Sequence, residues 1–179
     1  LLEEVLSAPK ALLTTSCTHA LEMAAILLDL RPGDEVIVPS FTFVSTVNAF
    51  VLHGARPVFV DVGGPHDLNL SVADAAAKVT PRTRALMVVH YGGYPADMDA
   101  IMEIAKERNL LVVEDCAEAH GSEWRGRKVG SIGHMGAFSF QQGKPLTCGE
   151  GGFVSTNDDD LAAKCASYAN FGRLPGRPV

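Results

Sequence analysis

Several signatures of common protein chemistry are missing from this 179-residue sequence. The four cysteines stand far apart, at positions 17, 116, 148 and 165, and the lack of a CxxC pair argues against zinc and thioredoxin-like chemistry. The histidines form no HExxH pair and no Gly-x-Ser-x-Gly elbow is present, so a metalloprotease or a serine hydrolase has no support. Gly143-Lys144-Pro145 departs from a nucleotide-binding P-loop, and the glycines of 130–136 have the wrong spacing for a dinucleotide fingerprint. No metal site is predicted.

The charge and the short apolar runs exclude further classes. The net charge is −6 and no basic run offsets it, which argues against a general nucleic-acid binder. No apolar run approaches the roughly 20 residues that span a bilayer, and the N-terminus lacks the basic segment and apolar core of a signal peptide. Widely spaced cysteines in such a composition are typical of a reducing compartment. We therefore expect a cytoplasmic protein whose partners include neither nucleic acid nor a membrane.

What the sequence does contain is a series of short apolar runs. Apolar residues make up 47% and charged residues 20%, as in a globular protein that can bury one sizeable core. The runs at 36–38, 58–60, 86–89 and 110–113 are continuous rather than alternating, which is typical of strands buried on both faces of a parallel sheet. With helices between them, these runs predict one doubly wound α/β domain, with a mostly parallel sheet flanked by helices.

Helical patterns occur between and after the apolar runs. Residues 18–29 are mostly apolar and predict a deeply packed helix, which the proline and glycine of 31–34 end. Residues 157–168 predict another helix, with Asn157 or Asp158 as its N-cap. Four further residues follow the spacing of one buried helix face: Met98, Ile101, Met102 and Ala105.

In a doubly wound sheet, ligands bind beyond the carboxyl ends of the strands, so function is sought there. The hydroxyl-rich stretch 14–18 enters the first long helix, where free backbone N–H groups can bind a phosphate. Simple N-capping by Ser16 or Thr18 is the alternative. Phe41 and Phe43 follow the first run, where one ring could stack on a flat ligand, although core packing is the commoner role.

Three polar residues follow later strands. Asp115 ends the run at 110–113 and could face a ligand cation or metal, or instead cap the next helix. Ser139 could donate to a phosphate, although a serine at a strand end needs no function. Lys144 lies on a loop between a strand-like run and a Gly-Glu-Gly-Gly turn. A lysine is most often a solvated surface charge, but an amine held inside a site can form a Schiff base.

These features form one consistent set. A hydroxyl-rich helix start, an aromatic ring, a strand-end acid and a loop lysine follow one another along the chain. Pyridoxal phosphate needs a phosphate cradle, a ring stack, a carboxylate for its pyridine nitrogen and a Schiff-base lysine. The set therefore predicts pyridoxal 5'-phosphate as the cofactor.

The sequence also resembles a known family. It is similar to the fold-type I, pyridoxal-phosphate-dependent sugar aminotransferases of the DegT/DnrJ/EryC1/StrS family, from about Pro9 to Arg173. The stretch 12–62 resembles in particular the dTDP-4-amino-4,6-dideoxygalactose transaminases. Four motifs carry the resemblance: Ser16-Cys17-Thr18-His19-Ala20-Leu21, Pro39-Ser40-Phe41-Thr42-Phe43-Val44, Val113-Glu114-Asp115-Cys116-Ala117-Glu118-Ala119-His120-Gly121, and Phe138-Ser139-Phe140 through Gly152.

The resemblance implies roles for the residues around the cofactor ring. Lys144 would hold the cofactor as a Schiff base and would be the acid–base catalyst. Asp115 would pair with the pyridinium nitrogen and keep the ring an electron sink, and Phe43 would stack on the ring. The fold implied is that of the large domain of pyridoxal-phosphate-dependent transferases of fold type I.

The resemblance also implies a phosphate site and one departure. Cys17 and Thr18 would bind the phosphate through backbone and hydroxyl groups, together with Ser139. The family often carries Gln or His near the cofactor phenolate, where this sequence has Glu118. A carboxylate beside a phenolate is repulsive unless one of them is protonated. Glu118 is still expected among the cofactor-binding residues.

Three functions are compatible with this resemblance. The first is transfer of an amino group from glutamate to a nucleotide-linked 4-keto-6-deoxy sugar, for surface polysaccharide or antibiotic sugar biosynthesis. The Gln-x-x-Lys pattern from Gln141 to Lys144 looks more like that of cyclitol aminotransferases and aminohydroxybenzoate synthases. A keto-cyclitol with glutamine as donor is therefore the second. A non-catalytic, regulatory protein that binds pyridoxal phosphate is the third.

The resemblance implies an incomplete enzyme. Residues 1–179 are expected to hold most of the large cofactor-binding domain, without its start and without the C-terminal small domain. Cofactor sites in this family lie at a dimer interface. A homodimer is therefore expected, with the partner subunit completing the pocket.

Overall fold

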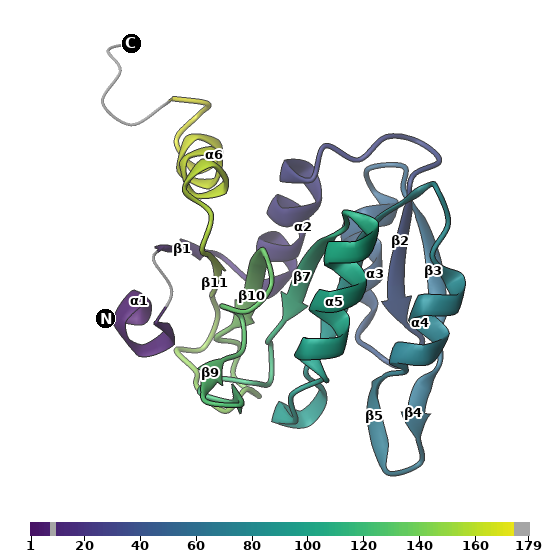
Figure 1. Cartoon of the computed structure of the whole chain (residues 1–179). Helices are drawn as coiled ribbons and strands as arrows, with labels where there is room; N and C mark the ends of the chain where they lie inside the picture. Colours follow the sequence, from purple (N-terminus) through teal and green to yellow (C-terminus); the bar gives the residue numbers. More distant parts are fainter. Residues whose placement is uncertain (8–9, 174–179) are drawn as a thin grey trace.

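The computed structural model describes residues 1–7 and 10–173. Pro9, where the resemblance begins, lies outside the described residues. Helices and strands alternate along most of the chain (Figure 1). The helices are α1 (Leu2–Leu6), α2 (Cys17–Leu27), α3 (Val44–Val51), α4 (Val72–Lys78), α5 (Met98–Arg108) and α6 (Asp159–Ala169), with a 3-10 turn, η1, at Tyr91–Gly93. The strands are β1 (Lys10–Thr14), β2 (Glu35–Pro39), β3 (Arg56–Val60), β4 (Val62–Gly64), β5 (Asp67–Leu70), β6 (Thr83–Val89), β7 (Leu111–Asp115), β8 (Glu123–Trp124), β9 (Arg127–Lys128), β10 (Met135–Ser139) and β11 (Gly152–Thr156).

A seven-stranded sheet forms the centre of the domain, in the order β1-β11-β10-β7-β6-β2-β3. The five strands from β10 to β3 pair in parallel. β11 runs antiparallel to both β10 and β1 at the other edge. The predicted α/β class with a mostly parallel sheet is confirmed, and the antiparallel edge is an addition to it.

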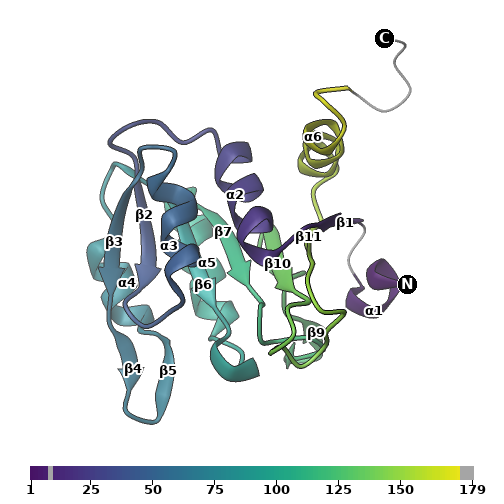
Figure 2. The ribbon, with the colours of Figure 1, turned by 180° about the vertical axis from the view of Figure 1, so that it is seen from behind.

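Helices cover both faces of this sheet. Figure 1 shows α4 and α5 in front of the strands, and Figure 2, seen from behind, shows α2 and α3 on the other face. Each face has its own apolar cluster: Met98 and Ile101 of α5 belong to one, Leu21 of α2 and Phe50 of α3 to the other. Because the helices cover the faces and not the ends, the carboxyl ends of the parallel strands are left for a ligand site.

The four predicted strands correspond to β2, β3, β6 and β7, and their burial depends on their place in the sheet. β2 is buried along its whole length, as its continuous apolar run predicts. Burial on both faces is wrong for β3, where Phe59 is 50% exposed. The reason is position: β3 lies at the edge of the sheet and has a neighbour, β2, on one side.

The predicted helices correspond to α2, α5 and α6. Met98, Ile101 and Ala105 are buried on one face of α5, as their spacing predicts. α6 is capped by Asp158, whose carboxylate accepts from the N–H of Leu161, so Asp158 and not Asn157 is the N-cap. Within the described residues, no helix has the length and apolarity needed to cross a membrane.

Candidate functional site

The carboxyl ends of four neighbouring strands, β10, β7, β6 and β2, form the edge where the predicted residues meet. Two hollows with volumes of about 380 Å³ and 50 Å³ open there, and they share Phe43, Asp115 and Lys144 among their lining residues. Together they are lined by all seven residues that the sequence singled out: Cys17, Thr18, Phe43, Asp115, Glu118, Ser139 and Lys144.

Asp115 is the buried acid of this site. Its side chain lies at the end of β7 and accepts from the N–H of Ala117 at 3.1 Å and from the Thr46 hydroxyl at 2.8 Å. Burial raises the pKa of Asp115, while these two donors and the charge of Lys144 oppose the rise. The alternative that Asp115 caps a following helix is wrong, because turns and no helix follow it.

Lys144 is partly buried rather than solvated, since 24% of its side chain is exposed. It lies in the loop between β10 and β11, where its own N–H donates to the carbonyl of Gln141 at 2.9 Å. Its Nζ lies 3.2 Å from Oε1 of Glu118. The other carboxylate oxygen of Glu118 accepts from the N–H of Gly92 at 3.0 Å. Glu118 thus joins the lysine to the turn that follows β6.

The N-terminus of α2 faces the larger hollow. Ser16 is the N-cap, and its hydroxyl accepts from the N–H of His19. The N–H groups of Cys17 and Thr18 belong to the first turn, so they have no acceptor within the helix and can serve an anion. Ser16 therefore does the capping, and the two candidate phosphate residues are left for a ligand.

Gly152 allows β11 to approach this helix start. A Cβ at this position would lie 2.6 Å from the carbonyl carbon of Ser16 and 2.7 Å from the nitrogen of Cys17. Since both are backbone atoms, they cannot move aside as a side chain would. The glycine that ends the Gly-Glu-Gly-Gly turn is thus needed to bring the lysine loop and α2 together.

Phe43 lies at the rim of both hollows, as the N-cap residue of α3. It is 73% exposed and Phe41 is 45% exposed, so the core-packing interpretation is wrong for both. An exposed ring beside a buried acid and an amine is placed to cover a flat ligand.

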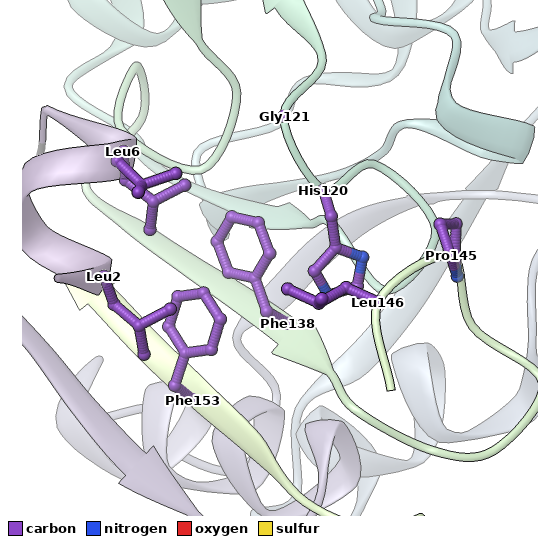
Figure 3. A pocket seen from close by; sticks show the side chains of 9 residues that line it. Leu2, Leu6, His120, Gly121, Phe138, Pro145, Leu146 and Phe153 are labelled. Atoms are coloured by element: carbon purple, nitrogen blue, oxygen red, sulfur yellow. The ribbon is translucent and has the colours of Figure 1, made fainter. Parts of the chain in front are cut away.

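An apolar cavity of about 290 Å³ lies on another side of the lysine loop. Figure 3 shows Leu2 and Leu6 of α1 lining it together with Phe138, and Leu146 of the loop lining it beside His120. Burial lowers the pKa of His120, which favours a neutral ring in this apolar setting. The lysine loop thus borders the polar hollows on one side and an apolar cavity on another.

Sequence reasoning missed three buried polar residues around the site: Thr46, His90 and Glu114. Thr46 is 69 residues from Asp115 in the chain, so no local pattern links them. Glu114 was seen only as the neighbour of Asp115. It accepts from three backbone N–H groups and from His90 Nε2, with the donors Gly130, Ile132 and Gly133 at 2.6 to 2.9 Å.

Glu114, His90 and Cys116 lie close enough to share an ion, with their ligand atoms within 4.8 Å of one another. Their chemistry fits a hydrogen-bond network better. Both oxygens of Glu114 already accept N–H groups, and His90 Nδ1 accepts from the N–H of Ala96 at 3.1 Å. Burial raises the pKa of the Cys116 thiol, which disfavours the thiolate that a metal requires.

The mostly parallel sheet flanked by helices is the fold of the pyridoxal-phosphate-dependent transferases of fold type I. The comparisons agree: residues 1–177 match the DegT/DnrJ/EryC1/StrS aminotransferase family, and the chain belongs to it. The chain is 49% identical over 160 residues to GDP-perosamine synthase of Caulobacter vibrioides, covering 89% of the chain and 43% of that protein.

Two further relatives widen the range. The chain is 45% identical over 181 residues to a putative L-glutamine:3-amino-2,3-dideoxy-scyllo-inosose aminotransferase of Micromonospora echinospora, covering 96% of the chain and 43% of that protein. The solved aminotransferase from Psychrobacter cryohalolentis superposes with a TM-score of 0.93 at 44% identity, over 97% of this chain and 44% of that one. The chain thus spans less than half the length of these relatives.

Proposed function

We propose that this chain is the cofactor-binding part of an aminotransferase that moves an amino group from glutamate to a nucleotide-linked 4-keto-6-deoxy sugar. The observation that carries the proposal is the meeting of the Lys144 amine, the buried Asp115 carboxylate and the start of α2 at one pair of hollows. These groups come from three separate parts of the sequence. They supply the amine, the acid and the anion site that pyridoxal phosphate requires.

Each lining residue fits one part of this cofactor. Lys144 would bind its aldehyde carbon covalently, and Asp115 would hold the proton on its pyridine nitrogen. Phe43 would cover one face of the ring. The N-terminus of α2, with Cys17 and Thr18, and the hydroxyl of Ser139 would bind its phosphate. Glu118 would also lie beside the cofactor, because its carboxylate accepts a hydrogen bond from the Lys144 amine.

The residues also supply the proton chemistry of a transaminase. Bound pyridoxal phosphate supplies an electron sink for the carbanion at the donor Cα. Lys144 would be the base that takes the proton from the donor Cα. Glu118, whose Oε1 lies 3.2 Å from the Lys144 Nζ, would hold the ammonium that this proton transfer produces near the site. Asp115 would hold the proton on the pyridine nitrogen, which the electron sink requires.

The keto substrate can be narrowed to two classes. The similarity to GDP-perosamine synthase favours a nucleotide-linked keto-sugar. The second candidate is a keto-cyclitol with glutamine as donor, as in an aminohydroxybenzoate synthase-like enzyme. It is favoured by Gln141, which lines the larger hollow, and by the scyllo-inosose aminotransferase relative. A regulatory protein that binds the cofactor without turnover would need Asp115 less than an enzyme does.

We further propose that the chain works in the cytoplasm as a homodimer whose partner subunit completes the pocket. Phe43, which lines both hollows, and its chain neighbours Phe41 and Val44 are exposed apolar side chains, as at an unfilled interface. A second subunit would remove them from water. Sedimentation of the chain would test this assembly.

The cofactor assignment is tested by absorbance and trapping. Incubation with pyridoxal phosphate should produce a Schiff-base band that disappears on borohydride reduction, with the label on Lys144. The variant Lys144→Ala should lose it, whereas the exposed Lys106→Ala, on α5, should keep it. An equal reducible adduct in Lys144→Ala would refute the assignment.

The donor and the class of protein are tested in the same cuvette. Loss of the band on adding glutamate favours the sugar aminotransferase, and loss with glutamine alone favours the cyclitol type. A band that neither amino acid removes would indicate a binding protein. A panel of keto-sugar nucleotides and keto-cyclitols then identifies the acceptor.

A further inference from the structure

A pair of threonine hydroxyls leads directly to the buried acid. Thr46 lies on α3, is 0% exposed, and donates its hydroxyl proton to Oδ2 of Asp115 at 2.8 Å. The Thr42 hydroxyl donates to the Thr46 oxygen at 2.9 Å. Thr42 precedes the N-cap Phe43 and Thr46 lies in the first turn of α3, so this hydrogen bond joins the incoming loop to the start of the helix.

The direction of the two hydroxyl hydrogen bonds depends on the charge of the Asp115 carboxylate. A hydroxyl has a single proton, and that of Thr46 goes to Asp115 rather than to the carbonyl one turn back, the usual acceptor of a helical threonine. Since the Thr42 proton goes to Thr46, both hydroxyls point toward the carboxylate. With the N–H of Ala117 on Oδ1, each carboxylate oxygen receives a donor, as the ionised form prefers.

Other groups act on the same carboxylate. Burial disfavours its charge, and the thiol of Cys17 faces Oδ1 from 3.9 Å on α2. The positive charge of Lys144, in the loop between β10 and β11, favours ionisation of Asp115. His90, at the end of β6, favours it more weakly. Of these, Thr46 is the neutral side chain whose hydrogen bond most clearly opposes burial.

Thr46 also connects the acid to the ring stack. Its own N–H donates to the carbonyl of Phe43 at 3.1 Å, and Phe43 is the N-cap residue of the same helix. The hydroxyl therefore fixes the start of α3 to the end of β7. Thr46 therefore contacts both Asp115, which is expected to face the pyridine nitrogen, and Phe43, which is expected to cover the ring.

We propose that Thr46, oriented by Thr42, is a positioning residue that holds the Asp115 carboxylate ionised and aimed into the hollow. The inference rests on the proposed function, because the group that Asp115 is held to face is the pyridine nitrogen of a bound cofactor. The geometry of the pair does not depend on the cofactor.

The test compares four variants of the full chain. Thr46→Val removes the hydroxyl at nearly constant shape, Thr46→Ser restores it, and Thr42→Val removes only the second hydroxyl. Thr156→Val is the matched control, since its buried hydroxyl donates to the carbonyl of His134 at 2.7 Å, at the far end of β11. The first measurement is the carboxyl-carbon titration of Asp115 by NMR without cofactor, assigned with Asp115→Asn.

We expect the Asp115 titration to move to higher pH in Thr46→Val, to move less in Thr42→Val, and to stay near the parent in Thr46→Ser and Thr156→Val. Affinity for pyridoxal phosphate should weaken about tenfold in Thr46→Val, the effect of losing one hydrogen bond to a charged group. An unchanged titration in Thr46→Val and Thr42→Val refutes the proposal.

Two further outcomes keep the tests separate. If Thr46→Val does not fold, Thr42→Val decides the question: it keeps the Thr46 hydroxyl but removes the group that orients it, and an unchanged Asp115 titration in that variant refutes the proposal. If the titration shifts as expected but Lys144 is never labelled, the proposed cofactor function fails. The proposal that Thr46 orients Asp115 toward a cofactor then fails as well. What remains is that the two hydroxyls stabilise the ionised carboxylate.

Discussion

Glu114→Gln should destabilise this protein far more than an ordinary loss of charge. The carboxylate is 0% exposed and accepts four hydrogen bonds, two on each oxygen. Glutamine has almost the same shape, but it replaces one acceptor oxygen by an NH2 group that can only donate. The variant therefore turns a satisfied site into one where donors face donors.

The size of the effect follows from the number of donors left without an acceptor. If the amide oxygen keeps the N–H groups of Ile132 and Gly133, those of Gly130 and His90 face the NH2 group. A change of tautomer at His90 would not help, because its Nδ1 already accepts from the N–H of Ala96. Each buried donor without an acceptor costs about 1–3 kcal/mol, so two cost about 2–6 kcal/mol.

Urea unfolding measures this loss. A domain of this kind has a stability of about 5–15 kcal/mol, so the variant should lose a large part of it. The control is Glu123→Gln, which removes a surface ion pair with Lys128 that is expected to contribute about 0–1 kcal/mol. A loss below about 1 kcal/mol in Glu114→Gln would refute the reasoning that the four N–H groups depend on the carboxylate.

Three further predictions concern the site. Because burial raises the pKa of Asp115, the folded state binds its proton more tightly than the unfolded state does. The unfolding free energy should therefore fall as pH rises above the unfolded-state pKa of about 3.9 and should level off above the folded-state pKa. Asp115→Asn should lack this fall and be the more stable protein at neutral pH, as urea series across pH would show. Gly152→Ala should cost about 1–3 kcal/mol in urea and weaken cofactor binding, while Gly143→Ala, which meets only the side chain of Gln141, should cost less. Phe43→Ala should leave stability within about 0.5 kcal/mol, since the ring is 73% exposed, yet weaken pyridoxal-phosphate binding in an absorbance titration; equal affinity would exclude the stacking role.

The fold was largely predictable because buried parallel strands leave a continuous apolar run. This holds for β2, β6 and β7, which lie inside the sheet. It fails at the edges: β3 has a similar run although Phe59 is half exposed, and the pairing of β1 with β11 joins residues more than 130 positions apart. Local patterns report how a segment is buried, and they do not report which distant segment pairs with it.

The candidate site shows the same division. Lys144, Asp115 and the start of α2 were found because strand ends and helix starts have local signatures. Thr46 was missed, because a threonine inside a helix has no signature until its acceptor is known. Core packing was the commoner role expected for Phe43, because most phenylalanines are buried. That expectation was wrong, since only the fold places this ring at the rim of the site.

Glu114 and Asp115 show why neighbouring acids can have opposite roles. Successive residues of a strand point to opposite faces, and Glu114 points toward the loop before β10 while Asp115 points toward α2 and α3. Glu114 receives four donors and leaves no room for a ligand. Asp115 is buried with fewer strong donors, so its charge is the less satisfied of the two and gains most from an added cation. A protonated pyridine nitrogen is such a cation. The number of donors around each carboxylate, which the sequence does not reveal, therefore separates the structural acid from the one available for chemistry.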